Sequence, residues 1–220
     1  MQYKTVHSTQ PVIADLSETI SQALASGKKV LWLVSGGSTI PIAAAVAKSL
    51  GMHDVSNLTI MQVDERYGDV GHVDSNWQAL ITAGLDCTSA HRLPVLRGKD
   101  MKTTVAAYQA ELAGMLQTAD VTIGLFGIGP DGHTAGMLPH SSAATETKQL
   151  VVGYDSSDFR RITITAPAIA QLDRAVVYAV GPAKARTLQA LGTDQPIADQ
   201  PAQALKHAAS LTVYTDYQGA

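Results

Sequence analysis

Residues 121–136 read Val-Thr-Ile-Gly-Leu-Phe-Gly-Ile-Gly-Pro-Asp-Gly-His-Thr-Ala-Gly. The apolar first part predicts a buried strand ending at Phe126, and the glycines and proline after it predict a tight turn. Asp131 and His133 stand two residues apart in this turn. A turn at the end of a buried strand is where α/β proteins place their chemistry, and histidine is the side chain best suited to move protons near neutral pH. The stretch therefore predicts an enzyme, with His133 as the first candidate for a catalytic residue.

The rest of the chain alternates strand-like and helix-like segments. Short continuous apolar runs predict buried strands at residues 30–34, 58–63, 120–126, 149–154, 161–165, 175–180 and 210–214. Apolar residues at helical spacing predict helices at 11–27, 40–50, 76–83, 102–117, 166–172 and 202–207, with a further helix from the Gly181–Pro182 turn to Leu191. This alternation predicts an α/β fold with a doubly wound, mostly parallel sheet and helices on both faces. We expect residues 1–220 to form one domain, with the loops at the carboxyl ends of its strands on one rim.

The composition excludes several classes of protein. Of the 220 residues, 45% are hydrophobic and 16% are charged, which predicts a substantial core rather than disorder. The formal net charge of -3 argues against general attraction to nucleic acid or to an anionic membrane. Cys87 is the only cysteine, so no internal disulfide is expected. The N-terminal segment lacks the apolar stretch of a signal peptide, and no apolar run approaches the ~18 residues that span a bilayer, so we expect a soluble cytoplasmic protein.

A second glycine turn, Ser35-Gly36-Gly37-Ser38-Thr39, follows the expected strand 30–34 and precedes a helix. Glycines let backbone N–H groups approach a ligand, the helix N-terminus adds partial positive charge, and the hydroxyls donate hydrogen bonds. This combination is typical of a phosphate site. The turn lacks the lysine of a P-loop and the spacing of a dinucleotide-binding motif. The alternative is an ordinary tight turn in which Thr39 caps the helix.

Three charged residues, Asp64-Glu65-Arg66, close the expected strand that begins at residue 58. The guanidinium of Arg66 suits a bidentate contact to phosphate, although either neighbouring carboxylate is an alternative internal partner. Residues 74–76, Asp-Ser-Asn, either close over the same rim or cap the helix expected from residue 76.

Two later segments of the chain each supply a cation, Lys184 and Arg161. Lys184 lies in the first turn of a helix, where the helix dipole does not favour a cation, so its position points to an anionic ligand; a solvated lysine is the alternative. Arg161 begins the expected strand 161–165 and supplies another cation.

Asp131 is expected to orient the imidazole of His133, unless both side chains only satisfy backbone groups of the turn. The histidines show no spacing typical of a metal site.

Together these segments resemble the 6-phosphogluconolactonase family. The resemblance covers about residues 30–191 and lies in the motifs SGGST, VDERYGDVGHVDSNW, LFGIGPDGHTAGMLP, RITIT and GPAKARTL, in the order of the family. It implies the doubly wound fold shared with glucosamine-6-phosphate deaminases and ribose-5-phosphate isomerases, and a sugar phosphate bound at the strand ends. The chain departs from the usual pattern at Ile40, at Tyr67–Gly68, and at Gly136 and His140, where the family commonly has serine and glycine.

The resemblance implies roles for individual residues. The family's histidine acts on the lactone carbonyl and corresponds to His133, with Asp131 as the second catalytic candidate. Cations matching Arg66 and Lys184 bind the phosphate, and Arg161 helps. The other substrate-binding candidates are Asp64, Gly36, Gly37, Ser38 and Thr39.

The expected activity is therefore hydrolysis of 6-phospho-D-glucono-1,5-lactone to 6-phospho-D-gluconate, a carboxylic-ester hydrolysis of the oxidative pentose phosphate pathway. His133 is expected to be the general base, and the expected partner is the small sugar-phosphate lactone, without cofactor or metal. A monomer or a weak homo-oligomer is expected. One alternative is an isomerase or deaminase of amino-sugar phosphates with Asp64 as base, although deaminases usually carry tyrosine where this chain has Arg66. The other is a non-catalytic sugar-phosphate sensor, a class usually attached to a DNA-binding domain.

Overall fold

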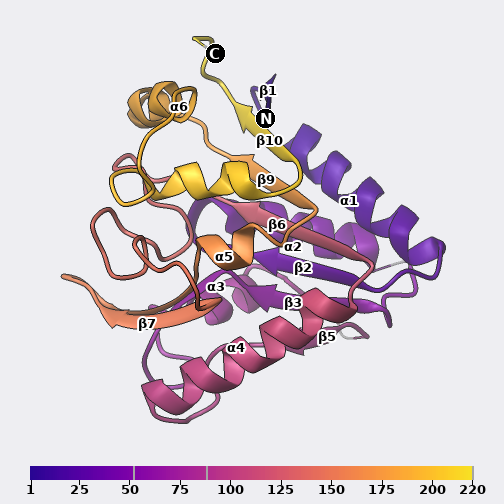
Figure 1. Cartoon of the computed structure of the whole chain (residues 1–220). Coiled ribbons are helices and arrows are strands. Elements are labelled where there is room, and N and C mark those ends of the chain that lie inside the picture. Colours follow the sequence, from indigo (N-terminus) through magenta and orange to yellow (C-terminus); the bar gives the residue numbers. More distant parts are fainter. Residues whose placement is uncertain (52, 88, 220) are drawn as a thin grey trace.

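The centre of the fold is a seven-stranded sheet. Its strands are β1 (Gln2–Thr5), β2 (Val30–Val34), β3 (Leu58–Gln62), β5 (His91–Leu93), β6 (Val121–Phe126), β9 (Arg174–Tyr178) and β10 (Leu211–Thr215). In the computed structural model, which describes residues 1–51, 53–87 and 89–219, they lie in the order β1-β10-β9-β6-β2-β3-β5 (Figure 1). Each neighbouring pair is parallel. The predicted α/β fold with a mostly parallel sheet is confirmed.

Helices cover both faces of this sheet (Figure 1). One face carries α1 (Gln10–Ala25), α2 (Ile40–Leu50) and α3 (Asn76–Thr82). The other carries α4 (Met101–Thr118), α5 (Ala166–Ile169), α6 (Ala185–Leu191) and the 3-10 segment η3 (Pro201–His207). Two short 3-10 segments, η1 (Gly37–Thr39) and η2 (Pro182–Lys184), lead directly into α2 and α6. Among the described residues, no helix has the length and apolarity needed to cross a membrane.

Strand β2 shows why the strands of this sheet read as continuous apolar runs. Leu31 and Leu33 belong to the apolar core on one face, and Val30, Trp32 and Val34 belong to the core on the other. Successive side chains of a strand point to opposite faces, and helices bury both faces here, so every position carries an apolar residue.

A small antiparallel sheet stands beside the parallel one. It consists of β4 (Asp64–Arg66), β8 (Arg160–Ile164) and β7 (Val151–Asp155), in the order β4-β8-β7. The strands expected near 149–154 and 161–165 therefore exist, but they do not join the parallel sheet as predicted. Burial alternates along β7, because only one face of that strand is covered. The pairing places Arg66 directly opposite Arg161.

The short elements were the ones that sequence patterns failed to predict. Strands β1 and β5 have four and three residues and lie at the edges of the sheet, largely exposed, so they lack an apolar run. The helix expected over 166–172 ends at Ile169, and the segment expected to be helical at 202–207 is a 3-10 helix. These elements are too short for a periodic pattern, so tertiary contacts decide their form.

The strand order reverses between β2 and β6. From β2 the chain adds β3 and β5 on one side, whereas from β6 it adds β9 and β10 on the other. Loops that leave the two central strands in opposite directions open a crevice between them, and ligands of α/β proteins bind at such a point. The loops in question are the two glycine turns, after Val34 and after Phe126.

Candidate active site

One cavity of about 270 Å³ opens at this crevice. Its walls come from the loops after β2, β3, β6 and β9 and from the small antiparallel sheet. The lining residues are Ser35, Gly36, Gly37, Ser38, Asp64, Arg66, Asn76, Gly127, Ile128, Gly129, His133, Ala135, Arg161 and Lys184. Residues that lie up to about 150 positions apart in the chain thus meet at one rim, because parallel strands present their carboxyl ends on the same side.

The first glycine turn forms one wall. Gly37 has a φ of +64°, a conformation that favours glycine. A Cβ on Gly36 would collide with the side chain of Asn76, so glycine lets that buried amide reach the cavity. The structure corrects the expectation for Thr39, which is fully buried beneath the turn and does not line the cavity. Its hydroxyl donates to the carbonyls of Ser35 and Gly36, at 3.1 and 3.0 Å, and so shapes the turn from behind.

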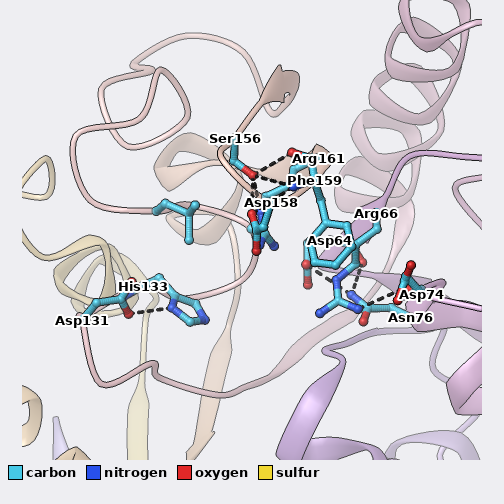
Figure 2. A network of polar contacts seen from close by, with 12 residues as sticks. Asp64, Arg66, Asp74, Asn76, Asp131, His133, Ser156, Asp158, Phe159 and Arg161 are labelled. Atoms are coloured by element: carbon cyan, nitrogen blue, oxygen red, sulfur yellow. Dashed lines mark hydrogen bonds and ion pairs between the residues drawn. The ribbon is translucent and has the colours of Figure 1, made fainter.

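The second glycine turn presents an oriented imidazole. The Nδ1 atom of His133 lies 2.6 Å from Oδ1 of Asp131 (Figure 2). The exposed fractions of the two side chains are 39% and 48%, so solvent reaches both. Partial burial by itself raises the pKa of Asp131, but the charge and hydrogen bonds of His133 outweigh it and lower that pKa. An ionised carboxylate only accepts hydrogen bonds, so Nδ1 carries a proton in this contact, and in the neutral imidazole the lone pair lies on Nε2.

Backbone contacts and small residues hold this turn in place. Gly129 N donates to the carbonyl of His133 at 2.8 Å, and a Cβ on Gly129 would collide with the imidazole. From α6, the Thr187 hydroxyl donates to the carbonyl of Pro130 at 2.9 Å. From η3, Ala202 N donates to the carbonyl of Gly132 at 3.0 Å. Hydrogen bonds from α6 and η3 therefore hold the turn in place.

Three cations line the same cavity. Arg66 donates from Nη1 to the carbonyl of Asp74 at 2.9 Å, and Arg161 pairs from Nη2 with Asp158 at 2.8 Å. Within the described part of the chain, Lys184 pairs with no carboxylate. Partial burial lowers the pKa of the Lys184 ammonium, while the charge of Asp131 acts in the opposite direction. Three cations converging on one small cavity favour an anionic ligand.

A buried carboxylate faces these cations. Asp64 is 7% exposed and accepts a hydrogen bond from Nδ2 of Asn76 at 3.2 Å. Burial, followed by the charge of Glu65, raises the pKa of Asp64 to about 6, against the lowering effect of Arg66 and the other nearby cations. In Figure 2 the Asp131–His133 pair faces this group across the site. Asp64 is therefore protonated more readily than an exposed carboxyl group.

Glu65 binds nearby backbone N–H groups, whereas the sequence had left open whether it pairs with Arg66. Its carboxylate accepts hydrogen bonds from the Ser75 hydroxyl and from the backbone N–H groups of Arg66, Asn76 and Trp77, at 2.6–2.9 Å. It therefore binds the unpaired N–H groups at the start of α3 and not the guanidinium of Arg66. Ser75 is the N-cap of that helix and accepts from Gln78 N at 3.1 Å, so the capping interpretation of residues 74–76 is confirmed for Ser75. Asn76, by contrast, lines the cavity.

The structure thus brings together most of the predicted site. His133, Asp64, the three cations and the turn from Gly36 to Ser38 line the cavity, Asp131 supports His133 from behind, and Thr39 does not take part directly. Asn76 was left open between closing over the rim and capping a helix, and it lines the cavity. The aromatic residue Phe159, which stacks on Arg66 and Arg161, was missed, because it belongs to no local motif with a recognisable chemistry. Among the described residues, no group of three or more His, Cys, Asp or Glu side chains is arranged to hold a metal ion.

A model of the glucosamine-6-phosphate isomerase/6-phosphogluconolactonase family matches residues 5–214 of the chain. The chain belongs to this family. It is 29% identical to the 6-phosphogluconolactonase of Mycobacterium leprae over 203 residues, which are 85% of this chain and 82% of that protein. It is 30% identical to the 6-phosphogluconolactonase of a Nostoc species over 164 residues, 70% of this chain and 67% of that protein. The resemblance seen in the motifs is therefore confirmed.

Solved structures of the family share the fold. A 6-phosphogluconolactonase from Thermotoga maritima superposes with a TM-score of 0.83 at 19% identity, covering 97% of this chain and 98% of that one. A monomeric glucosamine-6-phosphate deaminase superposes with a TM-score of 0.81 at 17% identity, covering 98% and 97%. At these identities the likeness concerns the fold.

One departure from the family's usual sequence has a steric reason in this chain. Gly136, where the family commonly has serine, packs against β4 and β8: its N–H donates to the Thr163 hydroxyl at 2.9 Å. A Cβ at this position would lie 2.8 Å from Thr163 Cβ and 3.1 Å from Asp64 Cβ. Glycine therefore lets the turn that carries His133 lie close to the small sheet that carries Arg66 and Arg161.

Proposed function

We propose that this protein hydrolyses 6-phospho-D-glucono-1,5-lactone to 6-phospho-D-gluconate. The observation that carries the proposal is the placement of an oriented imidazole, His133, and three cations, Arg66, Arg161 and Lys184, around one cavity. A sugar lactone with a distant phosphate needs both a base at the carbonyl and a cationic pocket for the phosphate. The family membership and the curated relatives named 6-phosphogluconolactonase support the same activity.

In the proposed reaction, Nε2 of His133 takes a proton from water as the water oxygen attacks C1 of the lactone. The carbonyl oxygen becomes an oxyanion, which N–H groups of the glycine turn that carries His133 stabilise. The bond between C1 and the ring oxygen then breaks, and the proton on Nε2 passes to that oxygen. Asp131 keeps Nδ1 protonated and stabilises the imidazolium. General-base catalysis contributes typically ~10²–10⁴ in rate.

The phosphate serves as a binding handle. Arg66, Arg161 and Lys184 hold its negative charge, with backbone N–H groups of Gly36, Gly37 and Ser38 beside them. Binding energy from this non-reacting group places C1 next to His133. Asp64 and Asn76 also line the cavity and are suited to hydrogen bonds with sugar hydroxyls.

The test is a lactone-hydrolysis assay coupled to 6-phosphogluconate dehydrogenase, with spontaneous ring opening subtracted. Turnover of the phosphorylated lactone well above turnover of glucono-1,5-lactone is the expected result. No enzymatic rate above the spontaneous one would overturn the proposal.

A second activity, aldose–ketose isomerisation or deamination of an amino-sugar phosphate, is favoured by one observation. Asp64 is a buried carboxylate that faces the cavity with a pKa raised to about 6, and such a group suits abstraction of a proton beside a carbonyl. Ammonia release from glucosamine 6-phosphate tests it. We rank this activity second because deaminases usually carry tyrosine where this chain has Arg66.

We further propose that residues 1–220 act as one sugar-phosphate-binding domain, as a monomer or weak homo-oligomer, in the cytoplasm and without a nucleic-acid partner. The formal charge of -3 gives no general attraction to nucleic acid, and a cavity of about 270 Å³ suits a small, free substrate. Light scattering coupled to size-exclusion chromatography tests the oligomeric state.

A further inference from the structure

Two like charges stand directly opposite each other in the small sheet. The register of β4 and β8 pairs Arg66 with Arg161, and both side chains line the cavity. Like charges at opposite positions of an antiparallel pair destabilise it. The free protein must therefore hold two guanidinium groups close together before any anion arrives.

One aromatic ring contacts both guanidinium groups. The Cζ atoms of Arg66 and Arg161 lie 5.0 and 5.5 Å from the centroid of the Phe159 ring, within the range of a cation–π interaction (Figure 2). Phe159 belongs to the turn between β7 and β8, where Ser156 N donates to the carbonyl of Phe159 at 2.8 Å. The backbone of the turn thus fixes the position of the ring.

The two arginines depend on this ring to different degrees. Arg161 also donates to the Ser156 hydroxyl at 3.0 Å and pairs with Asp158 at 2.8 Å. Arg66 donates from Nη1 to the carbonyl of Asp74, but its Nε is buried and has no hydrogen-bond partner among the described residues. The ring is therefore a large part of what orients Arg66.

We propose that Phe159 is a positioning residue that holds Arg66 and Arg161 together, so that both guanidinium groups are ready to bind one phosphate dianion. The proposal rests on the proposed function in one respect, because it assigns the phosphate of the substrate to these two arginines. The negative face of the ring offsets part of the repulsion between the cations in the free protein. A bound dianion then neutralises the charges of both arginines.

The experiment compares Phe159→Leu, which removes the π face at similar volume, with Phe159→Trp, which keeps an aromatic face. The matched control is Tyr67→Leu, because the Tyr67 ring stacks on Arg160 at 4.9 Å and Arg160 does not line the cavity. Each variant is assayed for KM and kcat with the phosphorylated lactone, for kcat/KM with glucono-1,5-lactone, and for binding of inorganic phosphate by calorimetry. Thermal unfolding followed by circular dichroism reports on folding.

Phe159→Leu is expected to raise KM for the phosphorylated lactone, and Kd for inorganic phosphate, about tenfold, in line with the loss of two cation–π contacts. kcat, and kcat/KM for glucono-1,5-lactone, should stay within about twofold of the wild type. Phe159→Trp should restore most of the affinity, and Tyr67→Leu should leave KM unchanged. A KM within twofold of the wild type in Phe159→Leu overturns the proposal. Equal losses on both lactones, or the same loss in Tyr67→Leu, also overturn it, since they show a merely structural role.

The phosphate titration separates this inference from the proposed function. A wild type that binds phosphate but hydrolyses no lactone refutes the proposed function, and the ratio of phosphate Kd values between Phe159→Leu and wild type still decides the role of the ring. A wild type that hydrolyses the lactone but shows no difference in KM or Kd from Phe159→Leu refutes the ring's role alone. Absence of phosphate binding and of lactone turnover in the wild type refutes both.

Discussion

The two sides of the cavity are built in different ways. The turn that carries Asp131 and His133 leaves the buried strand β6 and is tied by hydrogen bonds to α6 and η3, through Thr187 and Ala202. The side that carries Arg66 and Arg161 is a three-stranded sheet at the periphery, and its arginines are held by ion pairing, a stacked ring and single hydrogen bonds. The proposed catalytic pair thus stands on a half-exposed turn of the central sheet, whereas the two arginines proposed to bind phosphate stand on a separate antiparallel sheet whose buried side chains join the core.

Such a division predicts separable effects on kinetics. Changes in the turn that carries His133 should lower kcat, because the proposed base interacts with the reacting groups mainly in the transition state. Changes in the small sheet should raise KM for phosphorylated substrate, because they weaken a handle that is bound equally in ground and transition states.

His133→Ala should lower kcat ~10²–10⁴-fold while phosphogluconate still binds, because the general base is lost and the cations remain. Steady-state kinetics and calorimetry with 6-phosphogluconate check it. His140→Asn is the matched control: His140 also faces an aspartate, Asp199 at 3.5 Å, but lies outside the cavity and should keep full activity. Unchanged turnover in His133→Ala would remove the catalytic role.

Asp64→Asn should change how stability depends on pH, at the place where the two sides meet. The folded-state pKa of Asp64 is raised from 3.8 to about 6, so between these pH values the folded protein holds a proton that the unfolded chain has released. Wild-type stability from this group therefore falls as pH rises from about 4 to about 6, by up to about 3 kcal/mol. Relative to wild type, Asp64→Asn should gain that amount between pH 4 and pH 7 in denaturant unfolding. Parallel curves for both proteins would contradict the assignment.

Arg66→Gln should raise KM for the phosphorylated lactone ~10–100-fold, the size expected for losing a charge-assisted hydrogen bond. Activity on glucono-1,5-lactone should not change, because that substrate has no phosphate. Arg160→Gln is the control, since Arg160 pairs with Asp155 and Tyr67 away from the cavity. An equal loss on both lactones would break the separation between handle and chemistry.

Thr187→Val should lower kcat ~3–10-fold, because it removes the hydrogen bond to Pro130 that steadies the catalytic turn, a bond worth ~1 kcal/mol. Thr187→Ser keeps the hydroxyl and should retain wild-type kcat, and KM should change little in either variant. A rise in KM with constant kcat would show that this helix serves the phosphate site through Lys184 instead.

Sequence patterns predicted the long elements of the fold and several chemical groups of the site. Strands such as Val30–Val34 and Val121–Phe126 are buried on both faces, so nearly every position is apolar and the run is recognisable in the sequence alone. The glycine turns were recognisable because backbone approach to a ligand requires glycine. Edge strands and the pairing of β4 with β8 carry no such local pattern, since three-residue segments become strands only through their partners.

Residues close along the chain account for the α/β alternation, the two glycine turns and the candidate pair Asp131–His133, so these features were predictable from the sequence. Three features became visible only in the folded chain: Glu65 binds N–H groups at the start of α3, Thr39 lies behind its turn, and one cluster contains Arg66, Arg161 and Phe159. These features depend on strand register and burial, which arise from contacts between segments distant in the sequence.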